Sequence, residues 1–199
     1  MHQPGTGAWK EGRQGGASLC YVNLPTAQLN MVQAHHARVG IRASVACTAA
    51  SPDLRELVDR NWDIAIHGPT LDPQLAEALR ELDEKTQRGL VTTDDSQPAE
   101  PGNAFYRVTA QPGALEAGQP LPDTLPSMPT RPDVTALMAE IDAVVAGGQW
   151  AVWRFDAATV KALGEQAHAR LLRWLGDHHA RIWCAPIRDI VAWMLAARP

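Results

Sequence analysis

The sequence has little that would tie it to a membrane, to nucleic acid or to an oxidising compartment. Its three cysteines are an odd number, which argues against a closed set of disulfides and favours a reducing, cytoplasmic location. No apolar run approaches the roughly 20 residues of a membrane span, and none near the start is long enough for a signal peptide. The 18 basic residues are scattered and the formal net charge is -4, so we expect no nucleic-acid partner and no membrane partner. Arginines such as Arg154 are interpreted as solvated or locally paired charges.

The chain has enough apolar sequence for one core. Hydrophobic residues make up 45% of its 199 residues, which suffices for a single domain. Residues 1–16 are rich in glycine and polar side chains, so we expect a flexible lead-in there and one domain over residues 17–199. Proline and glycine crowd residues 96–132, which is typical of a long loop that is functional or partly disordered.

The stretch from Gly40 to Gly68 carries the clearest structural pattern. Apolar and polar residues alternate over residues 41–47 and again over 62–66, which indicates two strands. The residues Ser51-Pro52-Asp53 between them are typical of a helix start, and strands joined through a helix are expected to be parallel. His67 follows the second strand, at the end where α/β folds bind their ligands.

Strand and helix patterns alternate along nearly the whole chain. Further strands are expected at residues 17–21, 89–92, 105–109, 150–155 and 181–185, and helices at 26–39, 72–88, 134–145, around 160–171 and from 187 onward. This alternation predicts an α/β sheet or barrel with parallel strands.

The order of these segments resembles the polysaccharide deacetylase family, the group with nodulation-type chitooligosaccharide deacetylase homology, which folds as an irregular parallel (β/α) barrel. The resemblance covers about residues 17–198. Residues 39–68 are similar to the family's G-x-(R/K)-A-T … G-W-E-I-x-x-H stretch, and residues 150–192 to its W-x-V-x-x-F-H-G … W-x-A-P-x-x-E-I stretch. The resemblance implies a barrel of this type, reduced or open, and metal-assisted hydrolysis of amide or ester bonds.

The residues that would carry this chemistry depart from the family motifs. Where the T-F-D-D-G motif supplies two aspartates, this chain has Val22 and Asn23, and neither can replace a carboxylate as base or metal ligand. The H-(S/T)-x-x-H motif keeps His67 but has Leu71 in place of its second histidine, and the late histidine corresponds to Asp156. A lone imidazole does not hold zinc in a site that needs three protein ligands, so we expect no metal cofactor.

Five residues remain as candidates for a site at the carboxyl ends of the strands, each with an alternative. His67 is either a surviving catalytic residue or a remnant of a lost site, and Asp156 either assists catalysis or caps the following helix. Asn23 either contributes to ligand binding or is a turn residue. Asp94 and Asp95 either bind a ligand or cation or are a solvated pair in a loop.

Two kinds of residue draw attention without a motif. Trp153 either lines a sugar-binding cleft or packs in the outer layer of the barrel. The pair His35-His36 lies in a predicted helix, where neighbouring side chains point about 100° apart and cannot clamp one ion.

Two functions are compatible with these residues. The first, which we favour, is a catalytically degenerate deacetylase-like protein that binds a small molecule, a glycan or a protein partner, including a second copy of itself. The second is an active hydrolase of non-peptide C–N bonds or esters with a site rebuilt around His67 and Asp156. Only the second would need a divalent metal such as zinc.

Overall fold

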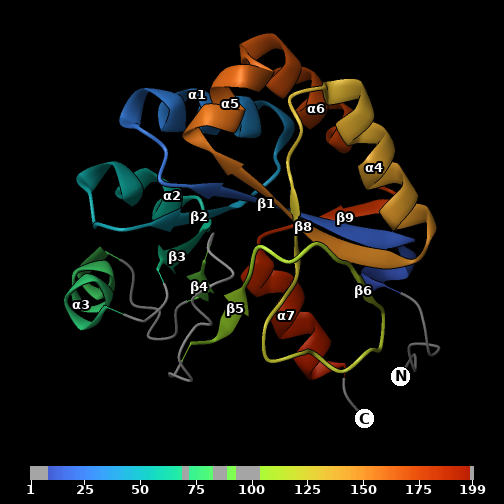
Figure 1. The fold of residues 1–199 in the computed structure, drawn as a ribbon, viewed down its shortest axis with the longest axis horizontal. Coiled ribbons are helices and arrows are strands. Elements are labelled where there is room, and N and C mark those ends of the chain that lie inside the picture. Colours follow the sequence, from blue (N-terminus) through green and yellow to red (C-terminus); the bar gives the residue numbers. More distant parts are fainter. Residues whose placement is uncertain (1–8, 69–71, 83–88, 93–103, 198–199) are drawn as a thin grey trace.

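A single sheet of nine strands, surrounded by helices, forms the frame of the molecule. The computed structural model describes residues 9–68, 72–82, 89–92 and 104–197. Figure 1 shows the elements in their arrangement around the sheet. In chain order they are η1 (Lys10–Gly12), β1 (Gly15–Val22), α1 (Thr26–Val39), β2 (Ser44–Cys47), η2 (Pro52–Leu54), α2 (Arg55–Asp59), β3 (Asp63–His67), α3 (Pro73–Leu82), β4 (Gly89–Val91), β5 (Tyr106–Val108), β6 (Leu115–Glu116), β7 (Ser127–Pro129), α4 (Val134–Ala146), β8 (Gln149–Asp156), α5 (Ala157–Leu163), α6 (Glu165–Asp177), β9 (Ile182–Cys184) and α7 (Ile187–Ala196).

Eight of the nine strands are parallel to one another: β9 pairs with β1, and the other seven form a series that nearly closes into a barrel. The order β5-β4-β3-β2-β1-β8 is parallel throughout, and β7 adds to the far side of β8, also in parallel. A bridge between Val108 of β5 and Leu125, just before β7, brings the two ends of this series together. The predicted architecture, an irregular barrel of parallel strands surrounded by helices, is confirmed.

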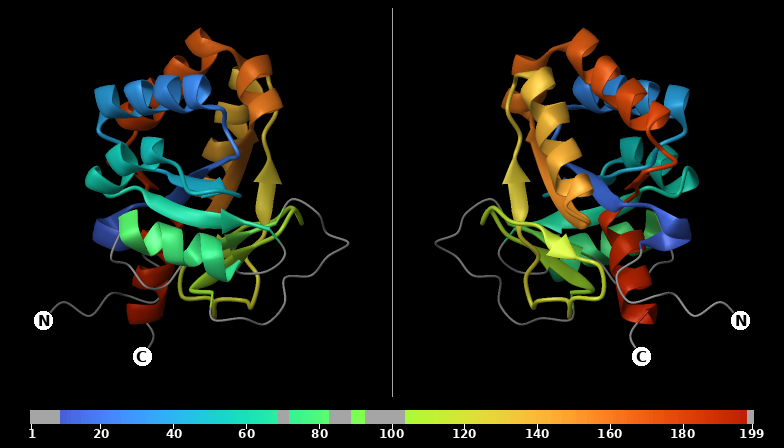
Figure 2. Two further views of the ribbon diagram at one scale, coloured as in Figure 1. Left: turned by 90° about the vertical axis from the view of Figure 1, so that its left-hand side faces the viewer. Right: turned by 90° about the vertical axis from the view of Figure 1, so that its right-hand side faces the viewer.

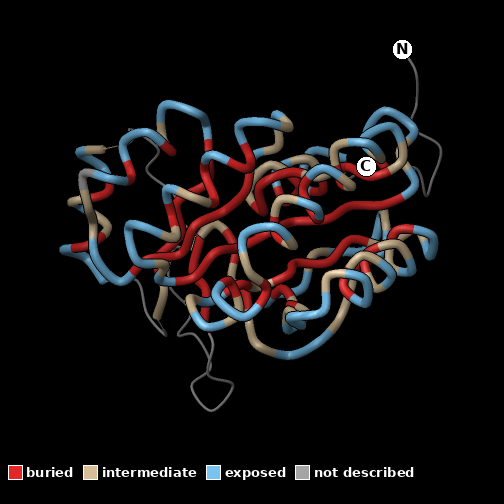
Figure 3. The backbone as a smooth tube through the Cα atoms, turned by 90° about the horizontal axis from the view of Figure 1, so that it is seen from above, coloured by how far each residue is buried: buried red, intermediate tan, exposed pale blue. Residues whose placement is uncertain are grey.

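The two faces of the strands build two separate cores. Outward-facing residues such as Tyr21 and Ile64 pack beneath the surrounding helices, whereas inward-facing ones such as Cys20 and Ala65 pack with α7. Alternate residues in the sequence of each strand thus face the outer and the inner side of the barrel wall. The buried strands run through the middle of the molecule with the exposed helix faces outside (Figure 3).

The helix α7 lies against the amino-terminal end of the barrel, held by a group of polar side chains that we term the floor cluster: Ser44, Asp63, Tyr106 and Arg188. The hydroxyl of Ser44 accepts from the N–H of Ile187 at 3.0 Å and donates to Asp63 at 2.9 Å. Tyr106 also donates to Asp63, which in turn accepts from the backbone N–H of Arg188 at 3.4 Å. Side chains of β2 and β3 therefore cap α7, satisfying donors that its own sequence leaves without a cap.

The ordered domain begins earlier than the composition predicted. Residues 9–16, expected to belong to the flexible lead-in, carry η1 and the start of β1. Trp9 is 2% exposed, stacks on Trp193 of α7 and donates its indole N–H to Gly148 at 2.8 Å. The domain therefore includes Trp9, which anchors the N-terminal segment to α7. The glycine-rich composition of residues 1–16 gave no indication of this contact.

Two further differences concern element boundaries. The helix expected around residues 160–171 is two helices, α5 and α6, because Gly164 adopts a φ of 77° between them. The proline- and glycine-rich stretch, in its described part, contains the short strands β6 and β7, which complete the wall beside β8. Figure 2 shows these strands on the side of the barrel away from α1 and α6.

Within the described ranges, no helix combines the length and the apolar character needed to cross a membrane. None of the three cysteines forms a disulfide. The cytoplasmic location stays a prediction.

Candidate functional site

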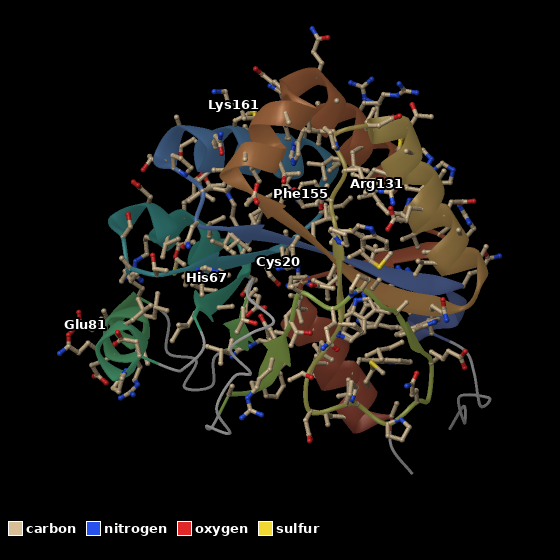
Figure 4. All side chains as sticks on the ribbon, viewed as in Figure 1. Cys20, His67, Glu81, Arg131, Phe155 and Lys161 are labelled. Atoms are coloured by element: carbon tan, nitrogen blue, oxygen red, sulfur yellow. The ribbon has the colours of Figure 1, made fainter. Side chains whose placement is uncertain are left out.

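The carboxyl ends of β1, β3 and β8 place four polar residues around the open end of the barrel, which we term the mouth: Asn23, His67, Arg154 and Asp156. His67 follows Asp63 and Ala65 on the inward face of β3. On β8, Arg154 lies opposite Cys20 and Asp156 lies opposite Val22, so both take the inward face as well. Figure 4 shows His67 in the central part of the molecule, away from the outer helices that carry Glu81 and Lys161.

A hydrogen bond joins Asn23 and His67. The amide Nδ2 of Asn23 lies 2.8 Å from Nδ1 of His67, and the amide oxygen accepts from the backbone N–H of Thr48 at 3.0 Å. Because the Thr48 N–H can only donate, it fixes the oxygen of Asn23 on its own side and leaves the NH₂ group for His67. His67 therefore accepts at Nδ1 and, as a neutral ring, carries its proton on Nε2.

The backbone around Asn23 supports this arrangement. Its φ is 48°, in the left-handed region that asparagine tolerates better than most residues, and its N–H donates to the carbonyl of Ala46 at 2.9 Å. Asn23 is thus a turn residue and also lies in contact with His67.

Burial and a neighbouring charge keep His67 neutral. The half-buried ring loses hydration, which lowers the pKa of His67 below its ordinary value, and the nearby Arg154 guanidinium lowers this pKa further. Arg154 donates to the carbonyl of Thr92 at 3.3 Å and is thereby held at the mouth instead of extending into solvent. The sequence interpretation of Arg154 as a solvated or locally paired charge therefore missed its place at the mouth, although its spacing of two residues from Asp156 on one strand could have indicated it.

The described residues of the mouth do not fit a divalent cation. Metal coordination through Nε2 of His67 requires the proton to move to Nδ1, where it would face the NH₂ donor of Asn23. A guanidinium close to the imidazole adds electrostatic repulsion. Over the part of the chain that the structure describes, no three His, Cys, Asp or Glu side chains are grouped as a metal site would require.

Asp156 caps a helix. Its carboxylate accepts from the N–H of Thr159 at 2.7 Å at the start of α5. The same N–H is the main reason that the pKa of Asp156 lies below its ordinary value. A general acid that replaces the family's histidine would need the opposite shift, so the geometry favours the capping role.

The other candidates divide between the core and the parts that are not described. Trp153 is 0% exposed and belongs to the outer core under the helices, where a ligand does not reach it. Asp94 and Asp95 lie outside the described residues.

No protein-family model and no curated protein matches the sequence. Solved structures do match it. The catalytic domain of a peptidoglycan N-acetylglucosamine deacetylase from Eubacterium rectale is 11% identical over 91% of this chain and 91% of that chain, with a TM-score of 0.56. The chain has the fold of the polysaccharide deacetylases.

Two other structures with the polysaccharide deacetylase fold show its range. A family 4 acetyl xylan esterase from Clostridium thermocellum, in complex with a cobalt ion, is 12% identical over 92% of this chain and 93% of that chain, with a TM-score of 0.55. A CE4 family pseudoenzyme from Bacillus anthracis is 11% identical over 88% of this chain and 65% of that chain, with a TM-score of 0.54. At these identities the likeness concerns the fold alone.

Proposed function

We propose that this protein is a catalytically degenerate member of the polysaccharide deacetylase family, which binds a glycan or a related small molecule without hydrolysing it. The observation that carries the proposal is the hydrogen bond from Asn23 to Nδ1 of His67. Asn23 stands where the resemblance implies a ligand carboxylate. Its amide also holds His67 in the tautomer with a proton on Nε2, the nitrogen that would bind a metal.

The other polar groups of the mouth support binding over hydrolysis. Arg154 is a permanent cation, which repels a metal ion at the same site and thereby disfavours metal-assisted hydrolysis. Asp156, which occupies the place of the family's acid, is engaged with the N–H of Thr159. Amide, imidazole and guanidinium groups are donors suited to the hydroxyl and acyl oxygens of a sugar.

Solved structures with this fold include both kinds of protein. A CE4 family pseudoenzyme is among them, and so is a variant of such a pseudoenzyme with restored enzymatic activity. Loss of activity on this scaffold thus has a precedent. The experiment below distinguishes the proposal from the alternative of an active hydrolase. A partner protein or a second copy of the chain, and the cytoplasmic location, stay predictions.

The proposal is tested by restoring one carboxylate. In Asn23→Asp, the new carboxylate accepts a hydrogen bond from His67, so the ring carries its proton on Nδ1, Nε2 has a free lone pair and the mouth gains a negative charge. We expect Zn²⁺ or Co²⁺ to bind this variant about 10- to 100-fold more tightly than the wild-type protein in calorimetric titrations. Asn30→Asp makes the same charge change on an exposed position of α1 and is expected to leave metal affinity unchanged.

Glycan binding is measured on the wild-type protein with chitopentaose. Calorimetry should detect binding, and an acetate assay should detect no release. If the wild-type protein binds one equivalent of zinc and releases acetate, and His67→Ala abolishes both, the protein is an active hydrolase. If chitopentaose and soluble peptidoglycan fragments both fail to bind, the glycan part of the proposal is wrong.

A further inference from the structure

Three histidines and a tyrosine form a buried polar network on the outer side of β1, remote from the mouth. It consists of Tyr21, His35, His36 and His168, and the four side chains are between 0% and 4% exposed. They come from β1, α1 and α6, and the hydroxyl of Tyr21 lies 2.8 Å from Nε2 of both His36 and His168. Nδ1 of His168 lies 2.9 Å from Nδ1 of His35. We call this group the histidine network.

The network has one proton arrangement in which every link is a donor facing an acceptor. Nδ1 of His36 faces the carbonyl of Ile41 at 3.1 Å, so it carries a hydrogen and leaves Nε2 as an acceptor. Tyr21 must then donate to His36 and accept from Nε2–H of His168. Nδ1 of His168 accepts in turn from Nδ1–H of His35. The chain of bonds is complete only while His36 and His168 are neutral.

An added proton breaks this pattern. On His36 it would place Nε2–H opposite the O–H of Tyr21, so that the tyrosine proton loses its acceptor. On His168 it would place Nδ1–H opposite Nδ1–H of His35, which is relieved only if His35 moves its own proton to Nε2, facing the Glu165 carboxylate at 3.7 Å. The network therefore resists protonation, and any charge that it accepts must be displaced toward α6.

Tyr21 and the neighbouring Cys184 contribute no competing change of charge in mild acid. Burial raises the pKa of Tyr21 well above 10.0 and that of the neighbouring Cys184 on β9 to about 12, so both stay neutral. The other neighbours in contact are the rings of Trp62 and Phe155, which do not titrate. Glu165 of α6 is the charged group that faces the network among the described residues.

We propose that the histidine network is an acid-sensitive latch, which fastens α1 and α6 to β1 at neutral pH and holds α6 progressively less strongly as the pH falls below about 6.5. The proposal is independent of the proposed function, because no residue of the network lies at the mouth. The helix α6 begins at the break made by Gly164, and this break gives it a hinge about which it can separate from α1.

The direction of the effect follows from the folded and unfolded states. Burial is the main cause that lowers the pKa of His36 to about 3 and that of His168 to about 4, from 6.5 in both cases. The two histidines make their full contribution to the free energy of unfolding above pH 6.5, where they are neutral in both the folded and the unfolded protein. It is lost between pH 6.5 and the two lower values, because the unfolded chain then binds protons that the folded network excludes.

The test measures the free energy of unfolding in urea at several pH values. Between pH 6 and pH 5, the free energy of unfolding of His168→Gln is expected to depend less steeply on pH than that of the wild-type protein. The difference should correspond to about one proton fewer taken up on unfolding, because glutamine supplies a donor and an acceptor but does not titrate. His179→Gln removes an exposed histidine near the C-terminal end of α6 and is expected to keep the wild-type slope. Hydrogen exchange at pH 5 should accelerate in α6 before it accelerates in β1 and β8.

A measurement on the wild-type protein keeps the proposal testable if the variant does not fold. Nitrogen-15 spectra at pH 7.5 should show His36 with its proton on Nδ1 and His168 with its proton on Nε2. The latch is refuted if either histidine shows the opposite tautomer, if either titrates above pH 6 in the folded protein, or if a folded His168→Gln keeps the wild-type slope.

Discussion

The two ends of the barrel differ in what their polar residues do. At the amino-terminal end, Asp63 is 3% exposed and its carboxylate accepts from two side-chain hydroxyls and from a backbone N–H of α7. At the mouth, the exposed Asn23 pairs with a neutral His67. A buried carboxylate thus caps a helix at one end of the barrel, while an amide and an imidazole pair at the other.

The difference indicates that the fold and the chemistry depend on separate residues. Removing Asp63 would leave buried hydroxyls without an acceptor, a cost that the whole domain bears. Replacing a carboxylate at the exposed position of Asn23 leaves its neighbours in contact with water, which costs the fold little. The chain keeps the barrel at 11% and 12% identity to a peptidoglycan deacetylase catalytic domain and an acetyl xylan esterase.

The largest effect on stability is expected from the aromatic contacts between Trp9 and α7. Trp9→Ala removes a side chain that is 2% exposed and stacks on Trp193 of α7. We expect a loss of about 4 kcal/mol in the free energy of unfolding, measured by urea denaturation. Lys10→Ala, which removes only an exposed contact with Trp183, should cost less than about 1 kcal/mol. Equal effects of the two changes would mean that residues 9–16 are a lead-in after all.

A smaller loss is expected when the charge of the floor cluster is removed. In Asp63→Asn, the amide oxygen can still accept from Ser44, Tyr106 and the backbone N–H of Arg188. The NH₂ group then takes the place of Oδ1, where it faces the Arg188 guanidinium, and the buried ion pair at 3.8 Å is lost, so we expect a loss of about 3 kcal/mol by the same measurement. The control is Asp189→Asn, which weakens a partly exposed ion pair with Arg42 at 2.8 Å and should cost less than about 1 kcal/mol. If both variants are equally stable, the contrast between the floor cluster and the mouth is wrong.

Local patterns in the sequence predicted most of the fold because they follow from local geometry. The expected helix at residues 26–39 coincides with α1, since its apolar spacing and Gly40 at its end are both local signals. The strand β7 was not predicted, because a strand of three residues among prolines carries no alternation to detect. The early start of the domain was also missed, since the burial of Trp9 depends on α7, at the far end of the chain.

The candidate site could be placed from the sequence, whereas its chemistry could not. Ends of parallel strands meet at one edge of a sheet, so Asn23 and His67 were expected to converge, and the structure brings them to 2.8 Å. The tautomer of His67 depends on the N–H of Thr48, which no sequence pattern reveals. The same limit applies to the histidine network, in which His35 and His168 are 133 positions apart.

The smallest effect is expected at the mouth, where it separates a cap from a catalytic acid. Asp156→Ala removes the acceptor of the Thr159 N–H and should cost about 1 kcal/mol in the free energy of unfolding. Asp156→Asn keeps an oxygen for that N–H and should cost only a few tenths. A catalytic role would reverse the order of importance, because asparagine cannot transfer a proton and any acetate release from chitopentaose would stop in Asp156→Asn. A wild-type protein that releases acetate and an Asp156→Asn variant that does not would therefore establish Asp156 as part of a working site.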